Sequence, residues 1–216
     1  MTPPDSGDAD AGEHGSSGHE ASSRDADTEA TGDSDVRYAV ILDYLAHGKA
    51  DSRSYDESPL AYALGIDNFR LFELRLDEEA GLGIGDRVAV GPPGERDAVE
   101  ELYEIEYDDL SNTANAELEY VVEEVVEDDE RRFVDFYNDA QPITLRLHQL
   151  NLLPGIGKKL RNNILDERKR GPFESFEDLE ERVSGLHHPK DVLVERIMEE
   201  LRDDDLKYKT FVGRNE

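Results

Sequence analysis

The stretch LNLLPGIGKK, Leu150–Lys159, places a Pro-Gly-Ile-Gly turn between two segments whose apolar residues recur at helical spacing. The apolar positions on the two sides of the turn are Ile143, Leu147, Leu150, Leu160, Ile164 and Leu165. Because glycine adopts positive φ without steric cost, we expect Gly155 and Gly157 to form a tight turn that directs Ile156 inward. The sequence therefore predicts two helices joined by a hairpin, and the second helix begins near Lys158.

The start of this second helix is a candidate anion site. The first backbone N–H groups of a helix have no partner inside it, and the helix dipole adds partial positive charge there. Lys158 and Lys159 follow the turn and increase that charge. A phosphate group is the ligand that such a site favours.

The region around the turn also differs in charge from the rest of the chain. The chain has 53 acidic and 24 basic residues, a formal net charge of -29. Residues 143–202 hold 11 basic and 11 acidic residues, whereas residues 36–142 hold 9 basic and 28 acidic ones. Residues 158–170 alone have 6 basic and 2 acidic residues. This is the basic stretch of the protein, and it favours contact with nucleic acid.

The overall acidity indicates adaptation to a salt-rich cytoplasm. Dense surface carboxylates keep a protein soluble, and molar salt shortens the Debye length to roughly 3 Å, which screens their repulsion. The competing interpretation is a nucleic-acid mimic or a histone-binding acidic protein. The acidic residues are spread along the chain instead of forming one block, which favours adaptation.

Composition excludes several classes of site. There is no cysteine, so disulfides, thiolate catalysis and cysteine-type zinc sites are excluded. No run of about 18 apolar residues is present, and the N-terminus lacks the order of a signal peptide. We expect a soluble, cytoplasmic protein without membrane contact.

Hydropathy divides the chain into five parts. Residues 1–35 have 10 acidic residues, one arginine and no aromatic residue, which predicts a disordered acidic tail. Residues 36–110 contain short strand patterns separated by Gly and Pro, which predict a closed or half-closed barrel. The expected strands are residues 38–45, 72–76, 86–91 and 103–107. Gly81–Gly85 is a turn that enters a strand and not an anion-binding loop, because no helix follows it.

The rest of the chain has helical periodicity, which makes the predicted fold α+β. Residues 111–142 read as connecting helices, residues 143–202 as a helical domain with two hairpins, and residues 203–216 as a C-terminal tail. In the second, degenerate hairpin, Ser175 and Asp178 fit a capping box and Ser184-Gly185 forms the turn. Two such hairpins can grip two phosphate runs without reading sequence.

The turn resembles the helix-hairpin-helix motif of non-sequence-specific nucleic-acid binders. The matching residues are Leu153, Pro154, Gly155, Ile156, Gly157 and Ile164. One position departs from the motif: Arg161 stands where a small residue is usual, so the two helices are expected to cross farther apart. The resemblance also implies that the carbonyls of Leu153 and Ile156 can bind structural K⁺ or Na⁺.

A wider resemblance covers residues 36–212. The strings YAVILDYLAHGK, GDRVAVG, LSNTANAELEYVVEEVV, RFVDFYNDAQPITLRLHQLNLLPGIGKK, ERKRGPFESFEDLEERV and RIMEEL are similar to the archaeal domain-of-unknown-function family 655. Its members are described as candidate RNA- or nucleotide-binding proteins. The resemblance implies an oligonucleotide-binding (OB)-like barrel followed by helix-hairpin-helix elements, and a role near ribosome biogenesis or translation with ribosome-associated proteins as partners.

These observations predict a non-enzymatic protein that binds nucleic acid, RNA or DNA, without sequence specificity, with RNA favoured over DNA. The expected contact residues are Pro154, Gly155, Ile156, Gly157, Lys158, Lys159, Arg161, Arg168, Lys169, Arg170, Ser184 and Gly185. The histidines lack a nucleophile or a metal-ligand spacing, so no catalytic residue, metal ligand or cofactor is assigned. The alternatives are a protein-interaction adaptor that uses the acidic barrel and a metal-dependent nuclease.

Overall fold

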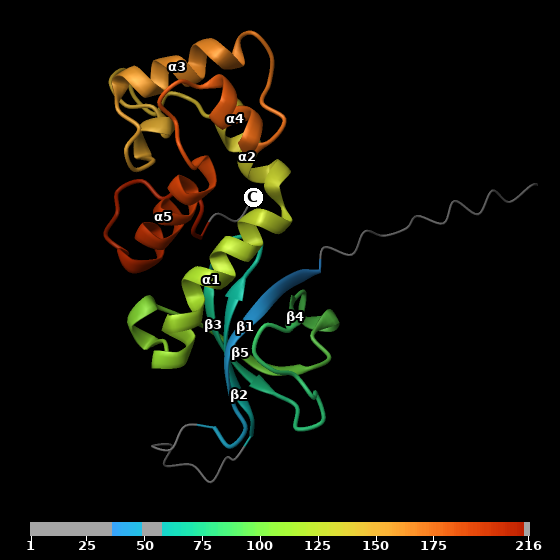
Figure 1. The fold of residues 1–216 in the computed structure, drawn as a ribbon. Helices are drawn as coiled ribbons and strands as arrows, with labels where there is room; N and C mark the ends of the chain where they lie inside the picture. The colour runs from blue at the N-terminus through green and yellow to red at the C-terminus, as the bar shows by residue number, and fades with distance from the viewer. Residues whose placement is uncertain (1–35, 49–57, 214–216) are drawn as a thin grey trace, which may run out of the picture. The chain divides into compact units, whose positions relative to one another are not determined.

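The computed structural model describes residues 36–48 and 58–213. In this part of the chain five strands come first and five α-helices follow, which confirms an α+β fold (Figure 1). The acidic tail predicted for residues 1–35 lies outside the described residues.

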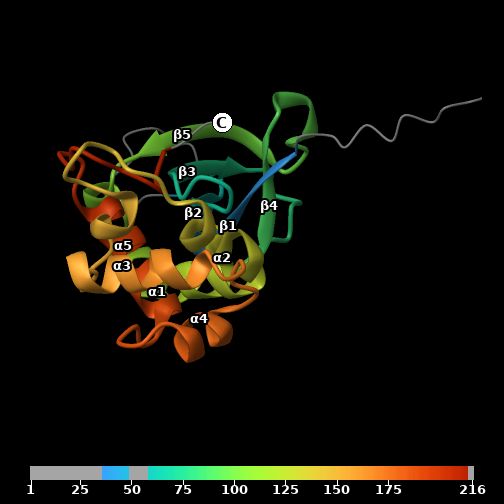
Figure 2. The same cartoon turned by 90° about the horizontal axis from the view of Figure 1, so that it is seen from above.

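The strands form one antiparallel sheet in the order β4-β1-β2-β3-β5. Their bounds are β1 (Arg37–Leu45), β2 (Leu60–Gly65), β3 (Leu71–Leu76), β4 (Arg87–Gly91) and β5 (Val99–Ile105). The two edge strands, β4 and β5, contact one another, so the sheet curls into a half-barrel. Figure 2 shows β5 arching toward β4.

Alternation along the strands gives the sheet two buried faces. Ala39 and Ile41 of β1 belong to a cluster built from the strands and their loops, inside the curl of the sheet. Val40 and Leu42, on the other face, belong to the larger cluster that the sheet shares with the helices. Period-two spacing therefore explains both clusters.

Strand β2 was not predicted from the sequence. All six of its residues, LAYALG, are buried, because one face points into the curl and the other toward the helices. A strand buried on both faces has no polar alternation, which is the signal that identified the neighbouring strand β3. The strand expected at residues 103–107 was placed too late: β5 ends at Ile105, and Tyr107 begins the 3-10 helix η2 (Tyr107–Asp109).

The helices cover one face of the sheet and one another. Their bounds are α1 (Asn112–Asp128), α2 (Glu130–Asp139), α3 (Lys158–Arg168), α4 (Phe176–Arg182) and α5 (Pro189–Arg202), and two further 3-10 helices are η1 (Pro93–Glu95) and η3 (Gln149–Leu152). Helix α1 contacts β1 and β2 and also α5 (Figure 1). Ser111 caps α1 by accepting the N–H of Ala114 at 3.0 Å.

The α-helix expected over residues 143–150 is absent, and this prediction was wrong. The chain instead forms a short loop closed by a β-bridge between Pro142 and His148, followed by η3. The hydroxyl of Thr144 accepts the backbone N–H groups of Arg146 and Leu147 at 3.3 and 3.0 Å. Such local side-chain bonds offer the backbone an alternative to helix, and they outweigh the spacing of the apolar residues here.

Residues 203–213 fold back onto α5. The carboxylate of Glu200, which is fully buried, accepts the backbone N–H groups of Thr210, Phe211 and Val212 at 2.8–3.1 Å. It also pairs with the buried guanidinium of Arg196 at 2.8 Å. This carboxylate holds the C-terminal segment together with Arg196, which donates to the carbonyl of Tyr208. The ring of Phe211 enters the core shared by the sheet and the helices.

Candidate functional site

The turn before α3 has the predicted positive φ at Gly155 but not at Gly157. Gly155 has a φ of +74°, and the N–H of Ile156 donates to the carbonyl of Leu153 at 3.2 Å. The Ile156 side chain is buried in the core, so it anchors the turn from below. Gly157 differs from Gly155: its φ of -78° and ψ of 179° are extended, and it is the N-cap of α3.

Helix α3 begins at Lys158, as expected, and its first turn is open. The backbone N–H groups of Lys158, Lys159 and Leu160 have no acceptor among residues 36–48 and 58–213, and no side chain caps the helix. A Cβ atom built at Gly155 or Gly157 would meet no other atom within 4 Å. Free N–H donors thus lie at the positive end of the helix, and the glycine backbone before them has open space around it.

The sequence around this turn contains a signal that motif matching and helical periodicity do not reveal. Residues 140–165 form a run of 26 positions without a single Asp or Glu, while the next longest such run, residues 206–215, has 10. Four cations stand in the longer run: Arg146, Lys158, Lys159 and Arg161. We call residues 140–165 the acid-free segment.

None of these four cations forms an ion pair with a carboxylate in the part of the chain that the structure describes. Arg161 bonds instead to the amide oxygens of Asn151 and Asn162, at 3.1 and 2.9 Å. The side chains of Lys158 and Lys159 are exposed. In a chain of net charge -29, the acid-free segment therefore keeps its positive charge uncompensated.

Asn151 connects the two sides of the turn. Its amide nitrogen donates to the carbonyl of Ile156 at 2.9 Å, and its oxygen accepts from Arg161 at 3.1 Å. The carbonyl of Leu153 accepts the N–H of Ile156. The two carbonyls expected to bind K⁺ or Na⁺ thus each accept one hydrogen bond within the chain, and Arg161 braces the turn against η3.

Lys169 and Arg170 lie at the opposite end of α3 from the turn. Lys169 pairs with Asp166 at 2.8 Å and Arg170 pairs with Glu167 at 2.6 Å. Both cations are exposed, so these ion pairs contribute little to stability, but their charge is compensated locally.

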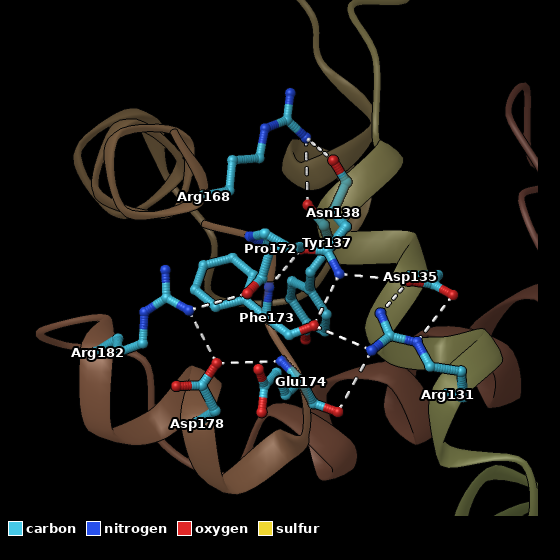
Figure 3. A network of polar contacts seen from close by, with 10 residues as sticks. All are labelled: Arg131, Asp135, Tyr137, Asn138, Arg168, Pro172, Phe173, Glu174, Asp178 and Arg182. Atoms are coloured by element: carbon cyan, nitrogen blue, oxygen red, sulfur yellow. Dashed lines mark hydrogen bonds and ion pairs between the residues drawn. The ribbon is translucent and has the colours of Figure 1, made fainter. Parts of the chain in front are cut away.

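Arg168 has a structural role. Its Nη1 donates to the carbonyls of Tyr137, Asn138 and Ala140 at 3.2, 2.8 and 3.0 Å, where α2 ends. Burial lowers the pKa of its guanidinium. Figure 3 shows this side chain directed at the end of α2. Arg168 thus caps a helix with one of its nitrogens.

The same region holds a polar network that joins α2 to the loop before α4 (Figure 3). The side chain of Asn138 accepts the N–H of Phe173 at 2.8 Å and donates to its carbonyl at 3.0 Å. The guanidinium of Arg182 lies 4.6 Å from the centre of the buried Phe173 ring. Phe173 is therefore a core residue.

The second hairpin runs from α4 through Ser184 and Gly185 to α5. Gly185 has a φ of +92°, and Asn163 of α3 donates to the carbonyl of Ser184 at 3.1 Å. The capping prediction at Ser175 is confirmed in part: its hydroxyl accepts the N–H of Asp178 at 3.1 Å. The Asp178 carboxylate accepts the backbone N–H of Glu174 and not that of Ser175, which a capping box requires.

The start of α5 has the opposite electrostatic surroundings from the start of α3. It borders an open cavity of about 660 Å³ whose lining includes Glu127, Glu130, Glu177, Glu180, Glu181 and Asp191. Pro189 at the first helical position has no N–H, and Lys190 lies 3.6 Å from Glu127. Carboxylates repel phosphate, so of the two hairpins the first offers the better anion site.

His148 lies at the base of the loop before η3 and is buried. Its Nδ1 accepts the N–H of Leu150 at 3.2 Å. Burial lowers its pKa, and the charges of Arg168 and Arg161 lower it further. The imidazole therefore ties the loop to the first turn of η3.

Two negative findings bear on other classes of function. Within residues 36–48 and 58–213, no three His, Asp or Glu side chains gather in a way that would hold a metal ion. No helix in these ranges has the length and apolar character needed to cross a membrane.

Comparisons with known proteins show what this chain is similar to. Uncharacterized protein MJ0038 of Methanocaldococcus jannaschii is 42% identical over 177 residues, which are 81% of this chain and 79% of that protein. The crystal structure of Af1531 from Archaeoglobus fulgidus has a TM-score of 0.74 and 41% identity, and the match covers 82% of this chain and 99% of that chain. The family described as "Protein of unknown function (DUF655)" matches residues 35–213, and this chain belongs to that family.

Proposed function

We propose that this protein binds nucleic acid, RNA in preference to DNA, by holding backbone phosphates at the N-terminus of α3. The observation that carries the proposal is the acid-free segment, whose four cations have no carboxylate partner among the described residues. Three of them, Lys158, Lys159 and Arg161, lie in the first turns of α3, beside its free N–H groups.

In this proposal η3, the glycine turn and α3 act as a helix-hairpin-helix whose first helix is a single 3-10 turn. A phosphate accepts from the N–H groups of Lys158, Lys159 and Leu160, and the two lysine side chains add charge from the flanks. Contacts of this kind position the backbone and carry no sequence information, so binding is independent of sequence.

The second hairpin and the half-barrel have other roles. The turn at Ser184 and Gly185 supports α3 through Asn163. The half-barrel corresponds to the OB-like barrel in this proposal. Its many acidic side chains repel phosphate, so it is better suited to binding a protein. The preference for RNA, a place in ribosome biogenesis or translation, and ribosome-associated partners rest on the family resemblance.

The test is a pair of charge-matched variants of the full chain. Lys158→Gln/Lys159→Gln removes two uncompensated charges, and Lys169→Gln/Arg170→Gln removes two that are paired with carboxylates. Fluorescence anisotropy with labelled RNA and DNA of mixed sequence, over a range of KCl concentrations, measures affinity and its salt dependence.

We expect the first variant to bind more weakly on every sequence and its salt slope to fall by about 1 for each phosphate that is no longer neutralised. The second variant should keep most of the wild-type affinity. Equal reductions in the two variants would place the phosphate site elsewhere. Cleavage of the probe in the presence of Mg²⁺ or Mn²⁺ would favour a nuclease, and absence of any binding would favour the adaptor.

A further inference from the structure

The most exposed large apolar side chain in the described residues is Leu145, at the tip of a loop formed by residues 141–149. Its side chain is fully open to water. Burying a leucine side chain is worth about 1.5–3 kcal/mol, so a partner that covers Leu145 gains a contribution to binding of that order.

Hydrogen bonds within the 141–149 loop fix the backbone that carries this leucine. The N–H groups of Ile143 and Thr144 both donate to the carbonyl of Leu147, at 2.8 and 3.0 Å. At the base, the N–H of Gln149 donates to the carbonyl of Gln141 at 2.9 Å, and the N–H of Gln141 donates to the Gln149 side chain at 2.6 Å. Because the tip is already ordered, inserting it into a partner costs little conformational entropy.

The tip belongs to the same electropositive region as the start of α3. The loop lies within the acid-free segment, and Arg146, next to Leu145, has an exposed side chain with no carboxylate partner in the described ranges. The loop leads directly into η3, and Asn151 of η3 accepts a hydrogen bond from Arg161 of α3 at 3.1 Å. The cations beside the tip therefore favour a polyanion as the partner that covers Leu145.

We propose that Leu145 is a wedge that inserts between neighbouring bases of the nucleic acid held at α3, while Arg146 contacts the adjoining phosphate or groove edge. Apolar side chains such as leucine can enter a base step and partly unstack it, which kinks the helix. This inference rests on the proposed function and adds to it: the ligand is a duplex or stem with a deformable step, and the complex is bent.

The experiment uses the full chain and short RNA and DNA duplexes with 2-aminopurine at a central pyrimidine–purine step, because unstacking raises 2-aminopurine fluorescence. Anisotropy of an end label measures affinity in the same samples. The variants are Leu145→Ala and Ile84→Ala. Ile84 is also an exposed apolar residue, but it lies outside the acid-free segment, and it serves as the matched control.

We expect wild type and Ile84→Ala to raise the fluorescence on binding, and Leu145→Ala to lose this rise while its affinity falls by no more than about tenfold. Both substitutions are at exposed sites, so folding should be unaffected. If wild type binds and the fluorescence does not rise, or if Leu145→Ala behaves as wild type, the wedge is overturned while the proposed function stands. If the wild-type protein binds neither the duplexes nor single-stranded RNA or DNA, the wedge and the proposed function are both overturned.

Discussion

At the scale of single residues, the basic side chains differ in whether they already pair with a carboxylate or, like Arg168, cap the end of a helix. The sequence groups Arg168, Lys169 and Arg170 with the two lysines of the turn because it shows only charge. In the structure Arg168 donates to carbonyls at the end of α2, and Lys169 and Arg170 form ion pairs with carboxylates one turn away. Sequence could predict that the helix begins at residue 158, but not which cations lack a carboxylate partner, since pairing depends on tertiary contacts.

His148 provides a pH-dependent prediction. Its pKa is held below its ordinary value of 6.5, so the neutral form stabilises the fold fully above pH 6.5, and this contribution is lost as the pH falls through the lowered pKa. We expect the free energy of unfolding to fall as the pH is lowered from 6.5. His148→Asn keeps an acceptor for Leu150 and does not titrate, so this fall should be smaller in the variant. Denaturant unfolding at several pH values measures both, and identical pH profiles would contradict the assignment.

Glu200 provides a prediction on stability. Removing one partner of a buried ion pair costs about 3–5 kcal/mol, and Glu200 also accepts three backbone N–H groups. Glu200→Ala should therefore destabilise the protein by several kcal/mol in denaturant unfolding. Glu199→Ala is the control, because Glu199 pairs with the same Arg196 from an exposed position. Similar destabilisation in the two variants would show that burial of the carboxylate is not what matters.

At the scale of elements, the strands and helices with a clear period were predictable, and the exceptions have identifiable causes. Strand β2 lacks alternation because both of its faces are buried. Residues 143–150 have helical spacing, but Thr144 bonds to the backbone two and three residues ahead, and the segment becomes a loop. The tip at Leu145, the most exposed large apolar side chain among the described residues, lies where the sequence predicts a helix.

The two glycines of the turn have different roles, which substitutions can separate. Gly155 has positive φ, so Gly155→Ala should cost about 1–2 kcal/mol of stability. Gly157 is an extended N-cap with open space above it, and threonine is about as good an N-cap as glycine. Gly157→Thr should keep the thermal midpoint of wild type and weaken binding, because its side chain covers the free N–H groups. Unchanged affinity in Gly157→Thr would argue against phosphate at this turn.

At the scale of the whole molecule, the net charge of -29 sets the conditions in which the fold is stable. Raising the salt from about 0.1 M to about 1 M shortens the Debye length from roughly 10 Å to roughly 3 Å and screens the repulsion among carboxylates. We expect the thermal midpoint, followed by circular dichroism, to rise over this range and to rise equally in KCl and NaCl. A midpoint that falls with salt would contradict this account of the acidity, and a difference between the two salts would indicate a specific cation site.

Because the rest of the chain is so acidic, a polyanion meets the least repulsion at the acid-free segment. There we propose that phosphate binds the free N–H groups at the start of α3. The most direct measurement is a titration of the ¹⁵N-labelled full chain with RNA in high KCl, followed by amide chemical shifts. The account predicts that the amides of Lys158, Lys159 and Leu160 move first and farthest, and that those of Lys190 and Asp191 at the start of α5 stay in place. Shifts confined to the half-barrel, or to α5, with residues 155–160 unchanged, would contradict it.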